Sequence, residues 1–442
     1  MSDLLTRKKA LRELLIFSVP IIIGQLGLML VGTGDMIIAG QYSRNCLAAV
    51  GLAISIQNPI MVGGLGFQFA LSPLLAQRRG RGEDPTVFFW TALLYSLFVA
   101  IGVFLLNILA IRLVRVFDYG PELNALVEQY LWITAPSMFG VCLYQGLKEF
   151  LQSMEKTISA NTIALLSAAV NLFFNYSLAF GKFGMPNLHE AGLAWASLSV
   201  RLLTAISLFL VAHAFWKSSK KIRWDFMKET LAIGAPISLS VFLEVMAFCS
   251  VTLFVGKFAT DQTAANNLAL NIGSLAFMIP LSVAQAVGVK VGHAYGEKKL
   301  NSIIIYAQVA LFTSVAFTAF NGFVFYTFPN AVMNFYTQDP DVLAWGKTLL
   351  FWVACFQIFD GAQVTLAGVL RGLSVTRAPT VAMFIGYWII GIPLGYYLGF
   401  YAGLEAQGFW IGLALSLAVV AMMLGFILRH KIKALENQGL KA

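Results

Sequence analysis

Long apolar segments recur along the whole sequence, and they limit what this chain can fold into. The clearest one runs from Leu231 to Gly256 and contains a single residue that can carry a charge, Glu244. As a helix, about 20 residues at a rise of ~1.5 Å each cross the hydrocarbon layer of a membrane. Segments of this length occur at residues 13–39, 47–77, 87–114, 122–152, 159–180, 190–216, 228–256, 262–294, 303–328, 342–372, 379–401 and 405–430. They predict an all-α integral membrane protein with 12 transmembrane helices.

Composition and charge support this class. The chain of 442 residues is 59% hydrophobic and only 12% charged, which is far more apolar than a soluble protein of this size. The net charge of +9 would suit a nucleic-acid partner, but the basic residues lie in short connectors between the apolar segments. The positive-inside rule predicts this pattern, so we expect no nucleic-acid partner and two cytoplasmic termini. The first apolar segment is too long for a signal peptide, contains Gln25 and Asp35 and shows no cleavage site, so we expect an uncleaved first helix. The cysteines have neither disulfide nor metal-ligand spacing and are interpreted as small buried hydrophobic residues: Cys46, Cys142, Cys249 and Cys355.

The second half of the sequence repeats the first. Pro236 lies 216 residues after Pro20, and Gly296 lies 216 residues after Gly80. Each repeat contains an even number of helices, so both halves enter the membrane from the same side. This predicts a pseudo-twofold axis along the membrane normal and a cleft between two six-helix lobes. The predicted parts are an N-terminal lobe at residues 1–216, a cytoplasmic basic linker at 217–228 and a C-terminal lobe at 229–442.

Three acidic residues, Asp35, Glu244 and Asp360, lie near the middle of predicted helices and depart from the repeat. On insertion scales each would cost roughly 2.5 to 3.5 kcal/mol if it faced lipid. We therefore expect all three to face a cavity. The alternative for Glu244 is a permanently protonated side chain that joins two helices, and for Asp35 it is an incidental acid in a seam of small residues.

Polar side chains accompany these acids on two helices. Gln357 and Gln363 lie three residues on either side of Asp360, and Phe356 lies one turn before it. Such a face can hold a desolvated cation or proton, with an additional contact to the Phe356 ring, or the two Gln side chains can simply bond neighbouring helices.

A pair of amides and one arginine complete the set of polar residues within predicted helices. Asn171 and Asn175, spaced i and i+4, put two amides on one face of the fifth helix, where they either line a polar cavity or link helices. Arg201, within the sixth helix, has two interpretations, as a partner of an acid or as a side chain that reaches the membrane surface.

Four motifs in this order resemble the multidrug and toxic compound extrusion (MATE) family, and most closely its bacterial NorM-type branch. They are GTGDMIIAG (Gly32 to Gly40), NLFFNYSLAFG (Asn171 to Gly181), FLEVMAF (Phe242 to Phe248) and FDGAQVTLAGVLRG (Phe359 to Gly372). The resemblance covers nearly the whole chain. It implies that Asp35 is the cation or proton site of the first lobe, and that Glu244 and Asp360 form a cation site, suited to Na⁺, in the second.

The resemblance also implies a polar role for Asn171 in the fifth helix. Asn175 stands where some members of the family carry an acid, which is a departure from a site built of two carboxylates.

The function implied is efflux of cationic, amphipathic compounds in exchange for Na⁺ or H⁺ by alternating access. We expect no cofactor and no enzymatic activity, small organic cations and the lipid bilayer as partners, and a monomer in the bacterial inner membrane.

Three other functions are compatible with some of these features. A flippase for lipid-linked oligosaccharides, from the same superfamily, would need basic residues at the midplane. An intramembrane hydrolase would need Glu244 and Asp360 to share one site. A channel would conduct without coupling to a gradient.

Overall fold

Helices make up almost all of the protein in a computed structural model that describes residues 5–114 and 120–438. Eleven helical spans among these described residues are long and apolar enough to cross a membrane. The remaining predicted span, the fourth in chain order, is divided into two shorter helices at Ala135 and Pro136. The predicted all-α membrane fold is therefore confirmed. The outermost residues of the predicted lobes, 1–4 and 439–442, lie outside the described residues.

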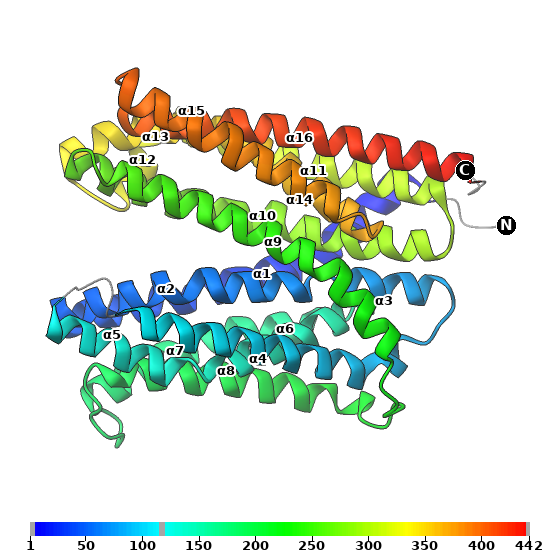
Figure 1. The fold of residues 1–442 in the computed structure, drawn as a ribbon, viewed down its shortest axis with the longest axis horizontal. Helices are drawn as coiled ribbons and strands as arrows, with labels where there is room; N and C mark the ends of the chain where they lie inside the picture. The colour runs from blue at the N-terminus through cyan, green and yellow to red at the C-terminus, as the bar shows by residue number, and fades with distance from the viewer. Residues whose placement is uncertain (1–4, 115–119, 439–442) are drawn as a thin grey trace. The chain divides into compact units, whose positions relative to one another are not determined.

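The helices fall into two groups along the chain (Figure 1). Those before the basic connector are α1 (Arg7–Tyr42), α2 (Arg44–Gln68), α3 (Leu71–Gly80), α4 (Phe89–Leu113), α5 (Pro121–Thr134), α6 (Ser137–Ser153), α7 (Ile158–Phe180) and α8 (Ala191–Val211). Those after it are α9 (Trp224–Val255), α10 (Thr260–Gly296), α11 (Leu300–Thr327), α12 (Pro329–Asn334), α13 (Pro340–Gly372), α14 (Arg377–Phe384), α15 (Ile392–Tyr396) and α16 (Glu405–Asn437). Lipid offers no hydrogen-bond partner to backbone N–H and C=O groups. Each apolar segment therefore forms a helix, in which these groups bond to one another.

Two compact units contain these helices, and proline marks where two of the helices pass from one unit to the other. Of the residues that the structure describes, the N-terminal unit comprises 19–75, 84–114 and 120–238, and the C-terminal unit comprises 5–18, 76–83 and 239–438. Helices α1 and α9 are each divided between the units close to an internal proline, Pro20 in α1 and Pro236 in α9. Proline lacks the N–H that an interior turn requires, and it bends a helix. The prolines that the repeat aligns therefore lie where these helices leave one unit for the other.

The glycines that the repeat aligns, Gly80 and Gly296, pack against each other within the C-terminal unit. A Cβ atom added to Gly80 would lie 2.1 Å from the carbonyl oxygen of His293, and one added to Gly296 would lie 2.1 Å from that of Gln77. The Gln77 side chain also donates a hydrogen bond of 2.8 Å to the carbonyl oxygen of Gly372. Glycine is required here because two backbones come too close for any side chain to fit.

A second close approach shows how the two repeats differ. In the C-terminal unit, a Cβ atom added to Gly368 of α13 would lie 2.4 Å from the carbonyl oxygen of Ala284 in α10. In the fourth helix of each half the offset of the repeat is 219 residues, which aligns Gly368 with Glu149 of α6. The Glu149 carboxylate accepts a hydrogen bond from the Ser72 hydroxyl. Both Glu149 and Ser72 are buried. The N-terminal unit therefore uses a buried polar contact at a position where the C-terminal unit uses glycine.

The four cysteines are free thiols. The prediction of burial is confirmed for Cys46 and Cys142, whereas Cys249 and Cys355 are half-buried. None of them forms a disulfide.

Candidate functional site

Helix α1 lies directly against α7 in the N-terminal unit, and glycine makes this possible. A Cβ atom added to Gly24 would lie 2.1 Å from Asn161 Oδ1, and one added to Gly27 would lie 2.6 Å from the Cα of Leu165. Close helix contacts in membranes commonly use small residues in this way. Asp35 follows Gly27 by about two helical turns, so the contact brings Asp35 next to the C-terminal half of α7.

Asp35 is buried among hydrogen-bond donors from α7 and α8. Its side chain is 2% exposed. Asn175 Nδ2 donates to Asp35 Oδ1 at 2.6 Å, and Ser197 Oγ donates to Asp35 Oδ2 at 3.0 Å. Asn175 Nδ2 also donates to Asn171 Oδ1 at 3.0 Å. The three residues predicted for this lobe are thus together, and Ser197 is a member that sequence reasoning missed.

Arg201 lies one turn after Ser197 on α8 and points into the N-terminal unit. Its Nη1 atom donates to Ser137 Oγ at 2.9 Å and to Gln57 Oε1 at 3.4 Å. Gln57 in turn donates to Thr134 Oγ1 at 3.1 Å. The Arg201 charge also interacts electrostatically with Asp35. Of the two interpretations of Arg201, the geometry agrees with a charge partner held at a distance from the acid.

Glu244 of α9 and Asp360 of α13 are brought together in the C-terminal unit. Their carboxyl groups are close enough to interact electrostatically. One turn away on each helix, the rings of Phe248 and Phe356 are in edge contact, with centroids 5.8 Å apart. The hydroxyl of Tyr387 donates to Glu244 Oε1 at 3.1 Å.

Tyr387 reaches Glu244 from a π-helical segment, Ile385–Gly391, which Figure 1 places between the labels α14 and α15. Single π-helical turns widen a helix locally and are frequent at functional sites. The next residue, Trp388, donates from its indole nitrogen to the carbonyl oxygen of Leu243 at 3.1 Å. Sequence reasoning missed Tyr387, although an adjacent Tyr and Trp inside an apolar segment are a signal that could have been followed.

The polar neighbours of Asp360 on α13 turn toward different helices. Gln357 donates to the carbonyl oxygen of Gly273 in α10 at 2.9 Å, and Gln363 contacts the sulfur of Met383 in α14 at 3.9 Å. The ring of Phe356 packs edge-on against Trp410, with centroids 5.6 Å apart. The two Gln side chains therefore fix α13 against its neighbours on either side of the acid.

Unpartnered oxygen atoms indicate what the C-terminal acids can hold. Asp360 Oδ1, Gln357 Oε1 and Gln363 Oε1 are buried and have no hydrogen-bond partner among the described residues. A buried carboxylate without a partner is costly, so it takes up a proton or a cation. Among the described residues no group of three or more His, Cys, Asp or Glu side chains lies together as in a transition-metal site. Buried carboxyl and amide oxygens without partners are of the kind that a proton or a small hard cation can occupy.

Comparison with known proteins identifies relatives along nearly the whole chain. The MatE family profile matches residues 20–177 and 236–397. The "Probable multidrug resistance protein NorM" of Bacillus subtilis (strain 168) is 30% identical over 437 residues, which cover 96% of this chain and 97% of that protein. The protein of the same name from Burkholderia pseudomallei (strain K96243) is 34% identical over 432 residues, covering 94% of this chain and 92% of that one.

Solved structures share the fold. The crystal structure of the eukaryotic MATE transporter AtDTX14 superposes with a TM-score of 0.87 at 19% identity, covering 98% of this chain and 99% of that chain. A multidrug resistance MATE family transporter of the MOP superfamily in an outward-facing conformation gives a TM-score of 0.85 at 20% identity, covering 98% and 97%. At these identities the likeness concerns the arrangement of helices alone.

Proposed function

This chain belongs to the MatE family, and on that basis we propose that it is a multidrug transporter that exports cationic, amphipathic compounds in exchange for Na⁺ or H⁺. The observation that carries the proposal is the pair of buried acidic sites, one in each unit. Asp35 accepts hydrogen bonds from Asn175 and Ser197, and Asp360, beside Glu244, has one carboxyl oxygen without a partner among the described residues. The family match supports a transporter and not an enzyme.

Coupling follows from competition for negative charge. An incoming cation at Glu244 and Asp360, or a proton at Asp35, neutralises the carboxylate that an organic cation would otherwise bind. The site then releases its cargo on the side where the ion entered. A carboxylate buried away from water interacts with either ligand more strongly than one in solvent would, because the surrounding dielectric is low. The two ligands therefore displace one another without direct contact between them.

The available driving force is sufficient for useful export. One unit charge that moves down about 150 mV yields roughly 3.5 kcal/mol, at 2.3 kcal/mol per 100 mV. At 1.4 kcal/mol per tenfold, this supports a concentration ratio of roughly 300 for a neutral substrate. One coupling ion per cycle is therefore enough for a neutral substrate, whereas one-for-one exchange with a singly charged organic cation moves no net charge and draws only on the concentration gradient of the ion.

We place the transporter in the bacterial inner membrane, as a monomer, with both termini in the cytoplasm. The basic residues of the connectors support this orientation through the positive-inside rule. The relatives cited above are bacterial proteins named for multidrug resistance. The basic connector at residues 217–228 then lies on the cytoplasmic side.

The decisive experiment is ethidium efflux from vesicles that contain the purified protein, with either a Na⁺ gradient or a pH gradient imposed. We expect accelerated efflux with one gradient and none without a gradient. Flux that is independent of both gradients would identify a channel and would overturn the proposal.

Asp35→Asn is expected to reduce the proton-driven rate at least tenfold, because an amide cannot take up the proton.

The Tyr387 hydroxyl is expected to set how tightly the C-terminal site holds its ion. In Tyr387→Phe the empty Glu244 carboxylate loses a hydrogen bond, which for a charged group contributes about 1.5 to 3 kcal/mol. Cation binding then becomes tighter, and the cation concentration for half-maximal efflux should fall about tenfold while the maximal rate decreases. Tyr397→Phe, at a side chain that is 60% exposed, is the matched control. If the cation dependence of efflux is unchanged in Tyr387→Phe, the tyrosine does not contribute to ion binding at this site.

A further inference from the structure

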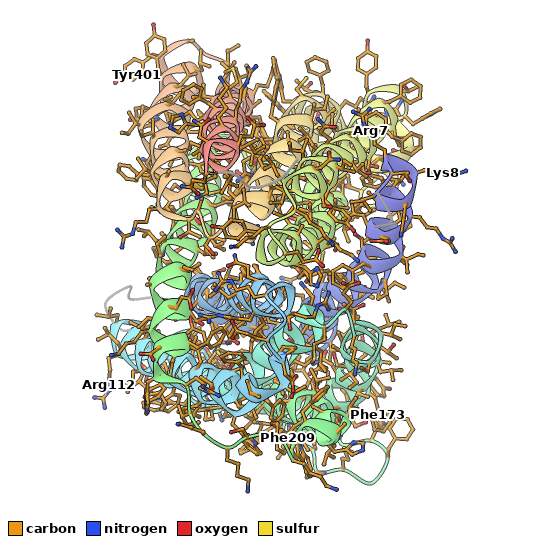
Figure 2. All side chains as sticks on the ribbon, turned by 90° about the vertical axis from the view of Figure 1, so that its right-hand side faces the viewer. Arg7, Lys8, Arg112, Phe173, Phe209 and Tyr401 are labelled. Carbon is orange, nitrogen blue, oxygen red and sulfur yellow. The ribbon has the colours of Figure 1, made fainter. Side chains whose placement is uncertain are left out.

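An apolar groove lies between α4, α6 and α8 in the N-terminal unit. Its volume is about 650 Å³, within the ~300 to 1,000 Å³ usual for small-molecule sites. Its walls include Leu97 of α4, Leu143 and Leu147 of α6, and Ile206 and Phe209 of α8. Phe209, near the C-terminal end of α8, is labelled in Figure 2. A surface lined by apolar side chains offers water few hydrogen-bond partners, so the ligand that fits it is apolar.

The groove is long and open on one side. Trp90 and Leu97 lie seven residues apart on α4, and so do Phe209 and Leu202 on α8, which corresponds to about 10 Å along each helix. The side chains of Leu97, Leu202 and Ile206 are exposed although they belong to membrane-spanning helices. An extended hydrocarbon chain that enters from the side matches this shape.

Polar groups occur at only one end of the groove. Among the side chains that line it, Trp90 and Lys220 alone carry a nitrogen. Trp90 is the second residue of α4, its ring lies 6.5 Å from that of Phe209, and its buried indole N–H has no hydrogen-bond partner among the described residues. Lys220 is exposed in the connector between α8 and α9. Trp90 and Lys220 thus both belong to the end of the groove at which α8 leads into the connector.

We propose that this groove binds one phospholipid with an anionic headgroup. An acyl chain occupies the leucine-lined part, and the phosphate accepts hydrogen bonds from the Trp90 indole and the Lys220 ammonium. The same connector carries further exposed positive charge at Lys221 and Arg223. Basic pockets beside transmembrane helices bind anionic headgroups, and tryptophan prefers the membrane interface. This lipid site goes beyond the proposed export function and does not depend on the coupling ion.

The lipid preference is measurable by native mass spectrometry of the purified full-length protein. Equal amounts of phosphatidylglycerol and phosphatidylcholine with identical chains are added in detergent. We expect preferential retention of phosphatidylglycerol by about fivefold, because a lysine near the surface contributes about 1 kcal/mol and 1.4 kcal/mol is tenfold. Lys220→Gln should abolish the preference. Lys217→Gln, with the same charge change outside the groove lining, should retain it.

A second pair of variants tests the groove itself. Leu97→Trp fills the groove from its open side and should reduce retention of both lipids at least fivefold. Leu105→Trp, on the same helix at a side chain that is 59% exposed and outside the groove lining, should not. Equal retention of the two lipids by the wild type, a preference that survives Lys220→Gln, or a transported organic cation held in place of lipid would overturn the assignment. The measurement uses no gradient, so its failure is distinct from failure of the export proposal.

Discussion

Asp360→Asn is expected to lower gradient-driven ethidium efflux at least tenfold, to the level of protein-free vesicles, while the protein still inserts and folds. Asp360 is 6% exposed, and one of its oxygens has no hydrogen-bond partner among the described residues. An amide preserves the shape of the side chain, but it takes up no proton and offers a cation no negative charge. The carboxyl group of Glu244 alone would then have to bind both ion and cargo. The measurement is the initial efflux rate under the gradient that drives the wild type.

Matched variants separate the loss of charge from a loss of folding. Asp341→Asn makes the same change on the same helix at an exposed residue and should leave the rate unchanged. Glu244→Gln should reproduce the effect of Asp360→Asn, because the two acids share one site. Asp360→Glu retains the charge and is expected to restore part of the activity. Wild-type efflux by both amide variants would exclude the C-terminal acids as the coupling site.

Gly296→Ala is expected to reduce the yield of folded protein severely, and its melting temperature by about 6 to 12 °C. The added methyl group would lie 2.1 Å from the carbonyl oxygen of Gln77 and 3.0 Å from the Cα of Gly80, and neither is the end of a flexible side chain. Overpacking of this kind costs about 3 kcal/mol, which corresponds to this shift for a unit of about 200 residues. Melting is followed by size-exclusion chromatography with fluorescence detection.

Gly425→Ala is the control for this prediction. Gly425 is also inside a helix, α16, but a Cβ atom added there meets nothing within 4 Å. Alanine at such a position favours the helix by up to about 1 kcal/mol relative to glycine, so the melting temperature should stay the same or rise. Equal melting temperatures for the two variants would show that the contact between Gly80 and Gly296 accommodates the added methyl group without a loss of stability.

The two sites differ in how far their members could be predicted. Asp35, Asn171 and Asn175 were grouped by the spacing of two amides and by the resemblance to a known family, and the hydrogen bonds of the structure join them. Ser197 could not be assigned in the same way, because a serine in a helix is as often bonded to its own backbone. Only the packing of α8 beside α1 gives its hydroxyl a carboxylate to bind.

The C-terminal site depends still more on tertiary structure. Glu244 and Asp360 are obvious in an apolar sequence, because a charge within a membrane is expensive wherever it occurs. That they share one site depends on the crossing of α9 and α13. The position of Tyr387 depends on a π-helical segment, whose extra residue per turn leaves no periodic signal in the sequence. Gln357 and Gln363 had the right spacing for a common face but bind opposite neighbours.

The sequence by itself determined the class of this protein, the number of spanning segments and the existence of a repeat, since hydrophobic length and helix-breaking residues act locally and leave a local record. It also determined which acids are out of place in lipid. Tertiary structure alone decided which side chains meet those acids and that Gly80 packs on Gly296. It alone also decided that a tryptophan donor without a hydrogen-bond partner among the described residues lies at the end of an apolar groove. Such contacts join residues far apart in the chain, and they depend on the angles and depths at which whole helices pack, which no short stretch of sequence specifies.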